Sequence, residues 1–239
     1  MNPLQNPNVA LLLSAVEKLV PLLDQIVFVG GCAAGVLITD PGAAPVRPTI
    51  DVDAIVEVAS YPELIDLGNR LRQLGFEQPH VEGAPLCRWV HEDIVFDLMP
   101  ADSKILGFSN RWYRPAIENA VTAEAGGRQI RLISAPYFLA TKLGAFHGRG
   151  QFDYRMSRDV EDIVAVLDGR PEIVVETQGS EASLHQYLAD EFSALLGERD
   201  FLEALPGQML PDAVSQQRIR IVVNRMQTDY WETLICGSC

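Results

Sequence analysis

The chain has 239 residues, of which 48% are apolar, and this excludes an intrinsically disordered protein and allows one large domain or a core with an appendage. Its formal net charge of −13 excludes indiscriminate binding to nucleic acid, because that affinity comes from cationic side chains that neutralise phosphates. Glu17 and Lys18 interrupt the apolar stretch near the N-terminus, so a secretion signal is not indicated and we expect a cytoplasmic protein without a membrane anchor.

Hydrophobic periodicity and turn residues predict the elements in chain order. The first are a helix over 9–23, a strand over 26–29 that stops at Gly30-Gly31, a helix over 32–38, a proline-rich loop over 39–48, a strand over 49–58 and a helix over 61–74. A hairpin follows, with arms 86–90 and 94–99 and a turn at 91–93, and then a strand over 129–133. Helices are predicted over 134–147, 157–167, 181–196, 199–205 and 213–228.

The cysteines indicate reduced thiols. Cys32, Cys87, Cys236 and Cys239 are too few and too scattered for a disulfide framework. The last two have C-x-x-C spacing, but no second pair of Cys or His accompanies them. We therefore interpret them as part of a frayed tail rather than as a zinc or redox site.

Asp51 and Asp53 present two carboxylates on the same side of the predicted strand over 49–58, because alternate residues of a strand point the same way. Their mutual repulsion requires a nearby cation or solvent. An exposed polar strand face is the simpler interpretation of the pair taken alone. The preceding Gly30-Gly31 instead favours a phosphate-binding site beside the two acids, since glycines at a helix start leave backbone N–H groups open to a phosphate.

Two carboxylates beside a phosphate-binding glycine turn suit Mg²⁺, which prefers oxygen ligands and commonly bridges protein carboxylates to substrate phosphates. Asp97, in the apolar run DIVFDLMP, is a candidate third carboxylate from a neighbouring strand. The alternative for Asp97 is an acid that is capped or paired at a strand end.

Lys142 is predicted to lie on the same helix face as Phe138 and Phe146. An ammonium among aromatic rings needs either an anion, here a phosphate or an active-site carboxylate, or a path along which it snorkels to solvent. Asp159 and Asp162 lie one turn apart in the helix that opens with SRDVEDI. Their alternative interpretation is acidic charge favoured by the dipole at a helix start.

Residues 104–158 form a basic segment between acidic flanks. They carry 9 basic and 3 acidic side chains, a net charge of 9 − 3 = +6, and aromatic residues are interleaved among them. The cations are Lys104, Arg111, Arg114, Arg128, Arg131, Lys142, Arg149, Arg155 and Arg158. This pattern is compatible with a solvated face or with a site for a polyanion.

The motifs FVGG, RPTIDVD, Lys142 and SRDVED together resemble the nucleotidyltransferase superfamily, which has the DNA polymerase β-like fold. Within it they resemble the AbiEii/AbiGii-type proteins, many of them toxins of type IV toxin–antitoxin pairs. The resemblance covers roughly residues 26–168. It implies an α/β (α+β) fold in which helices flank a mixed sheet, with a nucleotidyltransferase core over 1–133 and a mainly helical part over 134–239.

The resemblance also implies roles for individual residues. Asp51 and Asp53 would hold Mg²⁺ or Mn²⁺, and Asp97, Lys142 and Asp159 would complete the catalytic set. The nucleoside triphosphate would be contacted by Gly30, Gly31, Arg47, Thr49, Lys142, Arg149, Arg158 and Asp162.

The expected reaction transfers a nucleoside monophosphate from the triphosphate to an acceptor hydroxyl and releases pyrophosphate. The basic segment suits an RNA acceptor, such as the end of a tRNA, and a toxin would have an antitoxin protein as its partner. A small hydroxylic acceptor of the antibiotic type is the alternative enzyme. The alternative from another class is a catalytically silent relative that binds a nucleotide or a protein partner.

Overall fold

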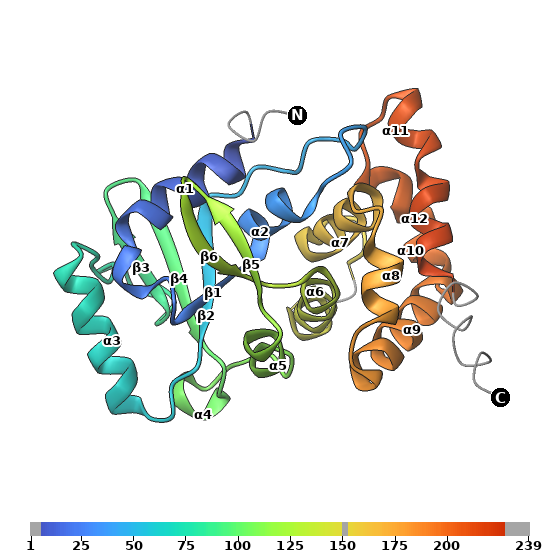
Figure 1. Ribbon diagram of the computed structural model, residues 1–239. Helices are drawn as coiled ribbons and strands as arrows, with labels where there is room; N and C mark the ends of the chain where they lie inside the picture. The colour runs from blue at the N-terminus through green and yellow to red at the C-terminus, as the bar shows by residue number, and fades with distance from the viewer. Residues whose placement is uncertain (1–5, 150–152, 228–239) are drawn as a thin grey trace. The chain divides into compact units, whose positions relative to one another are not determined.

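The computed structural model describes residues 6–149 and 153–227, except for the side chain of Arg149. The chain folds as two compact units (Figure 1). The sheet unit comprises Met1–Val36 and Arg47–Ser134, and the helical unit comprises Leu37–Val46 and Ala135–Cys239. The backbone therefore passes from one unit to the other at 36/37, 46/47 and 134/135.

The sheet unit contains a six-stranded mixed sheet in the order β3-β4-β2-β1-β6-β5. Its strands are β1 (Ile26–Val29), β2 (Asp51–Val56), β3 (Arg88–His91), β4 (Ile94–Pro100), β5 (Val121–Ala125) and β6 (Arg128–Leu132). The β2/β4 and β1/β6 pairs are parallel, whereas β1/β2, β3/β4 and β5/β6 are antiparallel. Helices α1 (Pro7–Lys18), α2 (Gly30–Leu37), α3 (Tyr61–Gln73), α4 (Ser103–Leu106) and α5 (Tyr113–Glu118) and the 3₁₀ turn η2 (Val20–Leu22) accompany the sheet.

Strand alternation gives the central strands two chemically different faces. Val52, Ala54 and Val56 of β2 are buried on one face, together with Phe96 and Leu98 of β4. The opposite face of the same two strands carries Asp51, Asp53 and Asp97. This second face is polar only at the end that carries the three acids, because Ile55, on the same face of β2, is completely buried.

The helical unit consists of α6 (Ala135–Arg149), α7 (Arg158–Gly169), α8 (Ile173–Gln178), α9 (Ala182–Gly197), α10 (Arg199–Ala204), η3 (Leu205–Gln208), α11 (Ala213–Gln217) and α12 (Ile219–Met226). The segment Leu37–Val46 is bound to this unit by specific hydrogen bonds. The backbone N–H groups of Thr39 and Asp40 both donate to the Gly169 carbonyl at 2.9 Å. Arg218 donates to the Asp40 carboxylate at 2.6 Å and to Asp168 at 2.7 Å.

Several predicted boundaries differ from those in the structure. The first helix ends at Lys18 instead of continuing to residue 23, because Pro21 lacks a backbone N–H and can only enter the short 3₁₀ turn. The predicted helix over 213–228 is divided into α11 and α12. Elements α4, α5, β5 and α8 were not predicted, since they are short and β5 is largely exposed and lacks apolar alternation.

Within the described ranges, none of the helices combines the length and the apolar character needed to cross a bilayer. The tail that contains Cys236 and Cys239 lies outside the described residues.

Candidate active site

Three carboxylates converge at the polar end of this second face of the sheet. Asp53 of β2 lies directly opposite Asp97 of the parallel strand β4, and Asp51 precedes Asp53 by two residues on the same face. One oxygen of each carboxylate lies within 4.8 Å of the others. Asp51 and Asp53 are partly exposed and Asp97 is buried, so the cluster opens to solvent on the side of β2.

Gly30 forms the corner that faces this cluster. It ends β1 and opens α2 with φ = +68°, a left-handed conformation that residues with a Cβ rarely adopt. A Cβ built on Gly30 would lie 1.9 Å from Oδ2 of Asp53 and 2.8 Å from its Cβ. Glycine at this position therefore lets the Asp53 carboxylate lie directly against the backbone at the start of the helix.

Hydrogen bonds from the Asn8 side chain connect the Gly30-Gly31 turn to the residues that precede β2. Its fully buried side chain donates from Nδ2 to the carbonyls of Gly31 at 3.1 Å and Arg47 at 2.9 Å. Its Oδ1 accepts a hydrogen bond from the Thr49 backbone N–H at 2.9 Å. The Thr49 hydroxyl in turn donates to Oδ1 of Asp51 at 2.7 Å. One amide thus holds the two chain segments that carry Gly31 and Asp51.

We expect Asn8→Ala to lower the free energy of unfolding by about 2–4 kcal/mol, because it leaves the buried Gly31 carbonyl and the part-buried Arg47 carbonyl and Thr49 N–H without their partner. Chemical denaturation measures this change. Ser14→Ala on the exposed side of the same helix is the matched control, and it should change stability by no more than about 0.5 kcal/mol. Equal effects of the two substitutions would contradict the role given to Asn8.

Arg88 is the cation that the carboxylates need. It lies on β3 opposite Asp97, and it donates from Nε and Nη2 to the two oxygens of Asp97 at 2.9 and 2.6 Å. The same Nη2 also lies 3.2 Å from Oδ2 of Asp51. Hydrogen bonding to Asp97 raises the pKa of the Arg88 guanidinium above its usual value, so it remains charged. Arg88 was not among the predicted site residues.

Cys32 lies next to the cluster without adding charge to it. Its thiol donates to the backbone carbonyl of Asp51 at 3.4 Å. Burial, followed by the negative charges of Asp53 and Asp51, raises the pKa of the Cys32 thiol. The thiol is therefore neutral and adds no negative charge to the cluster.

The donor set fits a divalent cation. The three carboxylates and the Arg88 guanidinium together have a formal charge of −3 + 1 = −2, which one divalent ion would neutralise. Carboxylate oxygens are hard ligands of the kind that Mg²⁺ and Mn²⁺ prefer. Asp51, Asp53 and Asp97 could hold such an ion, and Arg88 already contacts two of the three.

The predicted residues Thr49 and Arg47 also belong to the sheet unit. Thr49 contacts Asp51, as described above, whereas the half-buried Arg47 donates from Nη1 to the Pro48 carbonyl at 3.1 Å. Gly31 is buried, and a Cβ added to it would lie 3.0 Å from the Cβ of Thr49.

The other predicted residues belong to the helical unit. Lys142 of α6 lies 2.6 Å from Oδ2 of Asp162 and 3.2 Å from Oδ1 of Asp159, both on α7, and 5.7 Å from the centre of the Phe138 ring. All three charged side chains are almost completely buried. Arg158 is exposed in the first turn of α7, and the side chain of Arg149 lies outside the described residues. The anions that Lys142 contacts in the helical unit are thus two carboxylates.

The basic segment over 104–158 is divided between the two units. Some of its cations have internal partners: Arg114 lies 2.9 Å from Glu57, Arg155 lies 3.8 Å from Glu203, and Arg131 donates to the Ile117 carbonyl at 2.7 Å. Lys104, Arg111 and Arg128 are exposed on the sheet unit.

No protein-family model and no curated protein sequence matches this chain. Among solved structures, an antigenic nucleotidyltransferase-like protein from Paracoccidioides brasiliensis is similar, with a TM-score of 0.51, 19% sequence identity, and coverage of 84% of this chain and 94% of that chain. JHP933 from Helicobacter pylori has a TM-score of 0.49 and 13% identity, with coverage of 94% of this chain and 90% of that chain. The six-stranded mixed sheet flanked by helices is therefore the α/β fold of nucleotidyltransferase-like proteins.

Proposed function

We propose that this protein is a metal-dependent nucleotidyltransferase that moves a nucleoside monophosphate from a nucleoside triphosphate to an acceptor hydroxyl. In this reaction the acceptor oxygen forms a bond to the α-phosphorus, the bond from that phosphorus to the bridging oxygen of the β-phosphate breaks, and pyrophosphate leaves. The hydroxyl proton passes to a base. The observation that carries the proposal is the convergence of Asp51, Asp53 and Asp97 beside the Gly30 corner, on a nucleotidyltransferase-like fold.

The residues of the sheet unit have distinct proposed roles. Asp51 and Asp53 hold the divalent ion, which when bound neutralises phosphate charge and favours in-line attack. Thr49 orients Asp51 through its hydroxyl. The backbone N–H groups at the start of α2 bind phosphate, because a helix N-terminus attracts anions.

Asp97 is the proposed base, since it is the buried member of the three carboxylates. Its two oxygens accept hydrogen bonds from Arg88, which fixes the orientation of the carboxylate. Accepting a proton requires one of these bonds to lengthen. Arg88 is therefore proposed as a positioning residue that also limits the negative charge of the cluster before the metal binds.

The proposal extends to RNA as the acceptor. The exposed cations Lys104, Arg111 and Arg128 in the sheet unit and the stacking of Arg111 over Trp112, 5.0 Å from the ring centre, support it. The AbiEii/AbiGii-type sequence motifs support the same acceptor, as well as a toxin role with a protein antitoxin. The test incubates the protein with each α-labelled nucleoside triphosphate, Mg²⁺ or Mn²⁺, and total RNA, and follows the label into RNA.

Two results of this assay would favour other functions. Label that enters a small hydroxylic compound supplied in place of RNA, with little dependence on salt, would support the antibiotic-type enzyme, because RNA binding weakens steeply with ionic strength. Nucleotide binding without transfer would support a catalytically silent relative. The pairing of Arg88 with Asp97 favours this alternative, because it occupies both oxygens of the carboxylate that would act as the base.

We expect Arg88→Gln to tighten Mg²⁺ binding by at least about tenfold, because the formal charge of the cluster changes from −2 to −3 and a competing cation is removed. Calorimetric titration of the nucleotide-free protein measures this without any catalytic readout. Arg72→Gln, on the other face of the sheet, is the matched control. If Mg²⁺ affinity falls in Arg88→Gln, the metal does not share carboxylates with Arg88.

A further inference from the structure

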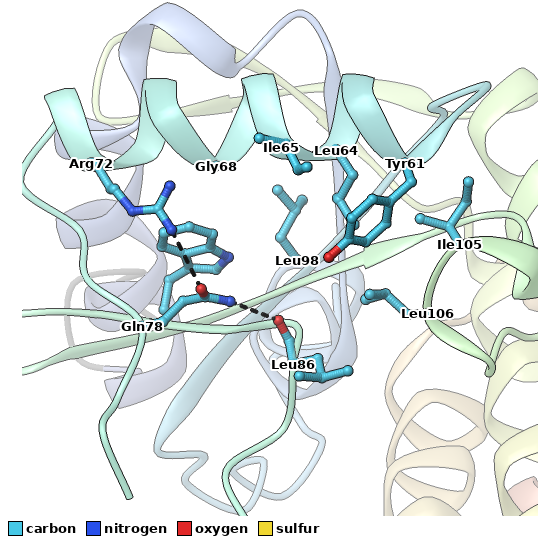
Figure 2. Close-up of a pocket in the computed structure, with 11 residues that line it drawn as sticks. Tyr61, Leu64, Ile65, Gly68, Arg72, Gln78, Leu86, Leu98, Ile105 and Leu106 are labelled. Atoms are coloured by element: carbon cyan, nitrogen blue, oxygen red, sulfur yellow. Dashed lines mark hydrogen bonds between the residues drawn. The ribbon is translucent and has the colours of Figure 1, made fainter.

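A cavity lies on the side of β3 and β4 opposite the carboxylates (Figure 2). Its volume is about 340 Å³, which is within the range of small-molecule sites. Helix α3 forms one wall, Trp89 and Leu98 contribute from β3 and β4, and α4 closes one end. Nothing in the proposed transfer reaction uses this cavity.

The walls of the cavity are mainly aliphatic, and some of them are open to water. Ile65 and Leu86 line it with 49% and 65% of their surface exposed, whereas Leu98 is buried beneath them. Gly68 brings α3 close to the indole, since a Cβ at this position would lie 3.1 Å from Cη2 of Trp89. The result is an open apolar groove, which an apolar ligand would cover.

Arg72 places a cation at one end of this groove. Its guanidinium lies over the Trp89 ring, 5.2 Å from the ring centre. It donates to two neutral amides, Asn69 at 3.0 Å and Gln78 at 3.5 Å. Across the described residues, no carboxylate forms an ion pair with Arg72. A guanidinium beside an apolar wall without its own counter-ion favours an anionic ligand.

The groove is elongated in the direction of α3. Arg72 and Tyr61 both line it and are three helical turns apart, roughly 16 Å along the helix axis. Figure 2 shows the Tyr61 hydroxyl pointing toward the interior of the cavity, at the end away from Arg72. A ligand with a single anionic head and a narrow apolar chain matches this arrangement.

We propose that this groove binds an unbranched aliphatic monocarboxylate, with the carboxylate at Arg72 and the chain along Gly68 and Ile65 over Leu98. The carboxylate would pair with the guanidinium at one end of the groove. The chain would cover the exposed surface of Ile65 and Leu86. The site is separate from the proposed transfer reaction, because it involves neither the three acidic side chains nor a metal.

The test is a calorimetric titration of the nucleotide-free protein with octanoate below its micellar concentration, compared with 1-octanol. Octanoate is expected to bind at least about tenfold more tightly than octanol, since only octanoate gains the charge-assisted contact. Arg72→Gln should weaken octanoate binding by about tenfold and leave octanol binding unchanged. Arg72→Lys should retain part of the preference for octanoate.

Arg70→Gln is the matched control. It removes the same charge from the same helix, but Arg70 contacts Gln25 and the Pro21 carbonyl, outside the groove. Its octanoate affinity should equal that of the unmodified protein. Equal affinities for octanoate and octanol, or no effect of Arg72→Gln, would overturn the proposal.

Light scattering tests a different occupant. If the chain is a dimer that Ile65→Glu dissociates, and octanoate does not bind, a second copy covers the groove and the carboxylate proposal is wrong. If the chain is monomeric, Ile65→Glu should weaken octanoate binding, because it adds negative charge at the mouth of the groove. None of these measurements depends on nucleotidyl transfer, so either proposal can fail alone.

Discussion

Asp53→Asn is expected to lower the rate of nucleotidyl transfer by about 10³-fold, on the scale of removing one preorganised electrostatic partner from an active site. Asp53 faces both Gly30 and Asp97, so its carboxylate is the central member of the cluster. Asparagine has the same shape but no charge, and a divalent ion would lose one of its oxygen ligands. Single-turnover transfer of labelled nucleotide measures the effect.

A thermal shift with and without Mg²⁺ separates loss of chemistry from loss of folding. The metal-free variant should unfold within about 1 kcal/mol of the unmodified protein, because the substitution also relieves repulsion between carboxylates. The unmodified protein should gain about 1.4 kcal/mol when Mg²⁺ is present at ten times its dissociation constant, and Asp53→Asn should lose this gain. Asp93→Asn, in the exposed turn between β3 and β4, makes the same change of charge and should retain both properties. Full transfer activity in Asp53→Asn would refute the proposed reaction.

Gly30→Ala is expected to lower the free energy of unfolding by about 3 kcal/mol or more. One part of this cost is the left-handed backbone conformation at φ = +68°. The other part is steric, since the new Cβ would lie 1.9 Å from Oδ2 of Asp53 and 2.8 Å from its Cβ. Rotation of the Asp53 side chain moves the carboxylate but leaves its Cβ in place, so the backbone must also shift. Denaturant titration measures the change.

Gly127→Ala isolates the backbone part of that cost. Gly127 has φ = +74° in the turn between β5 and β6, and nothing lies within 4 Å of a Cβ added there. We expect it to cost about 1 kcal/mol, which is the conformational term alone. If the two glycine substitutions destabilise the protein equally, the close contact between Gly30 and Asp53 has no energetic weight.

Whether Arg88 lies beside the acids depends on the length of the turn between β3 and β4. A three-residue turn at 91–93 pairs Val90 with Ile94 and would place Arg88 opposite Phe96, whereas the structure pairs His91 with Ile94 and so places Arg88 opposite Asp97. Because a shift of one residue moves a side chain to the other face of a strand, the predicted hairpin put Arg88 on the face away from Asp51 and Asp97, which it contacts in the structure. Strand alternation placed the two acids of β2 on one face, and local pattern is sufficient for such a prediction.

Asn8 could not be found in this way. Its partners Gly31 and Thr49 are 23 and 41 residues away in the sequence, and they meet it only through the tertiary fold. A buried asparagine at the start of an amphipathic helix has no distinctive local pattern. Lys142 is an intermediate case: its position among aromatic residues predicted a need for an anion, but only the structure identifies Asp159 and Asp162 as its partners in the helical unit.

The backbone passes between the two units at three points, and this limits how genes for such proteins can recombine. A single genetic crossover near residue 134 would transfer the helices after it but leave Leu37–Val46 behind, with Ala43 deprived of its neighbour Gly169 and Asp40 deprived of Arg218. Exchange of an intact helical unit needs matched junctions at 36/37 and 46/47 as well. The two halves of this chain are therefore expected to be inherited together rather than shuffled as independent modules.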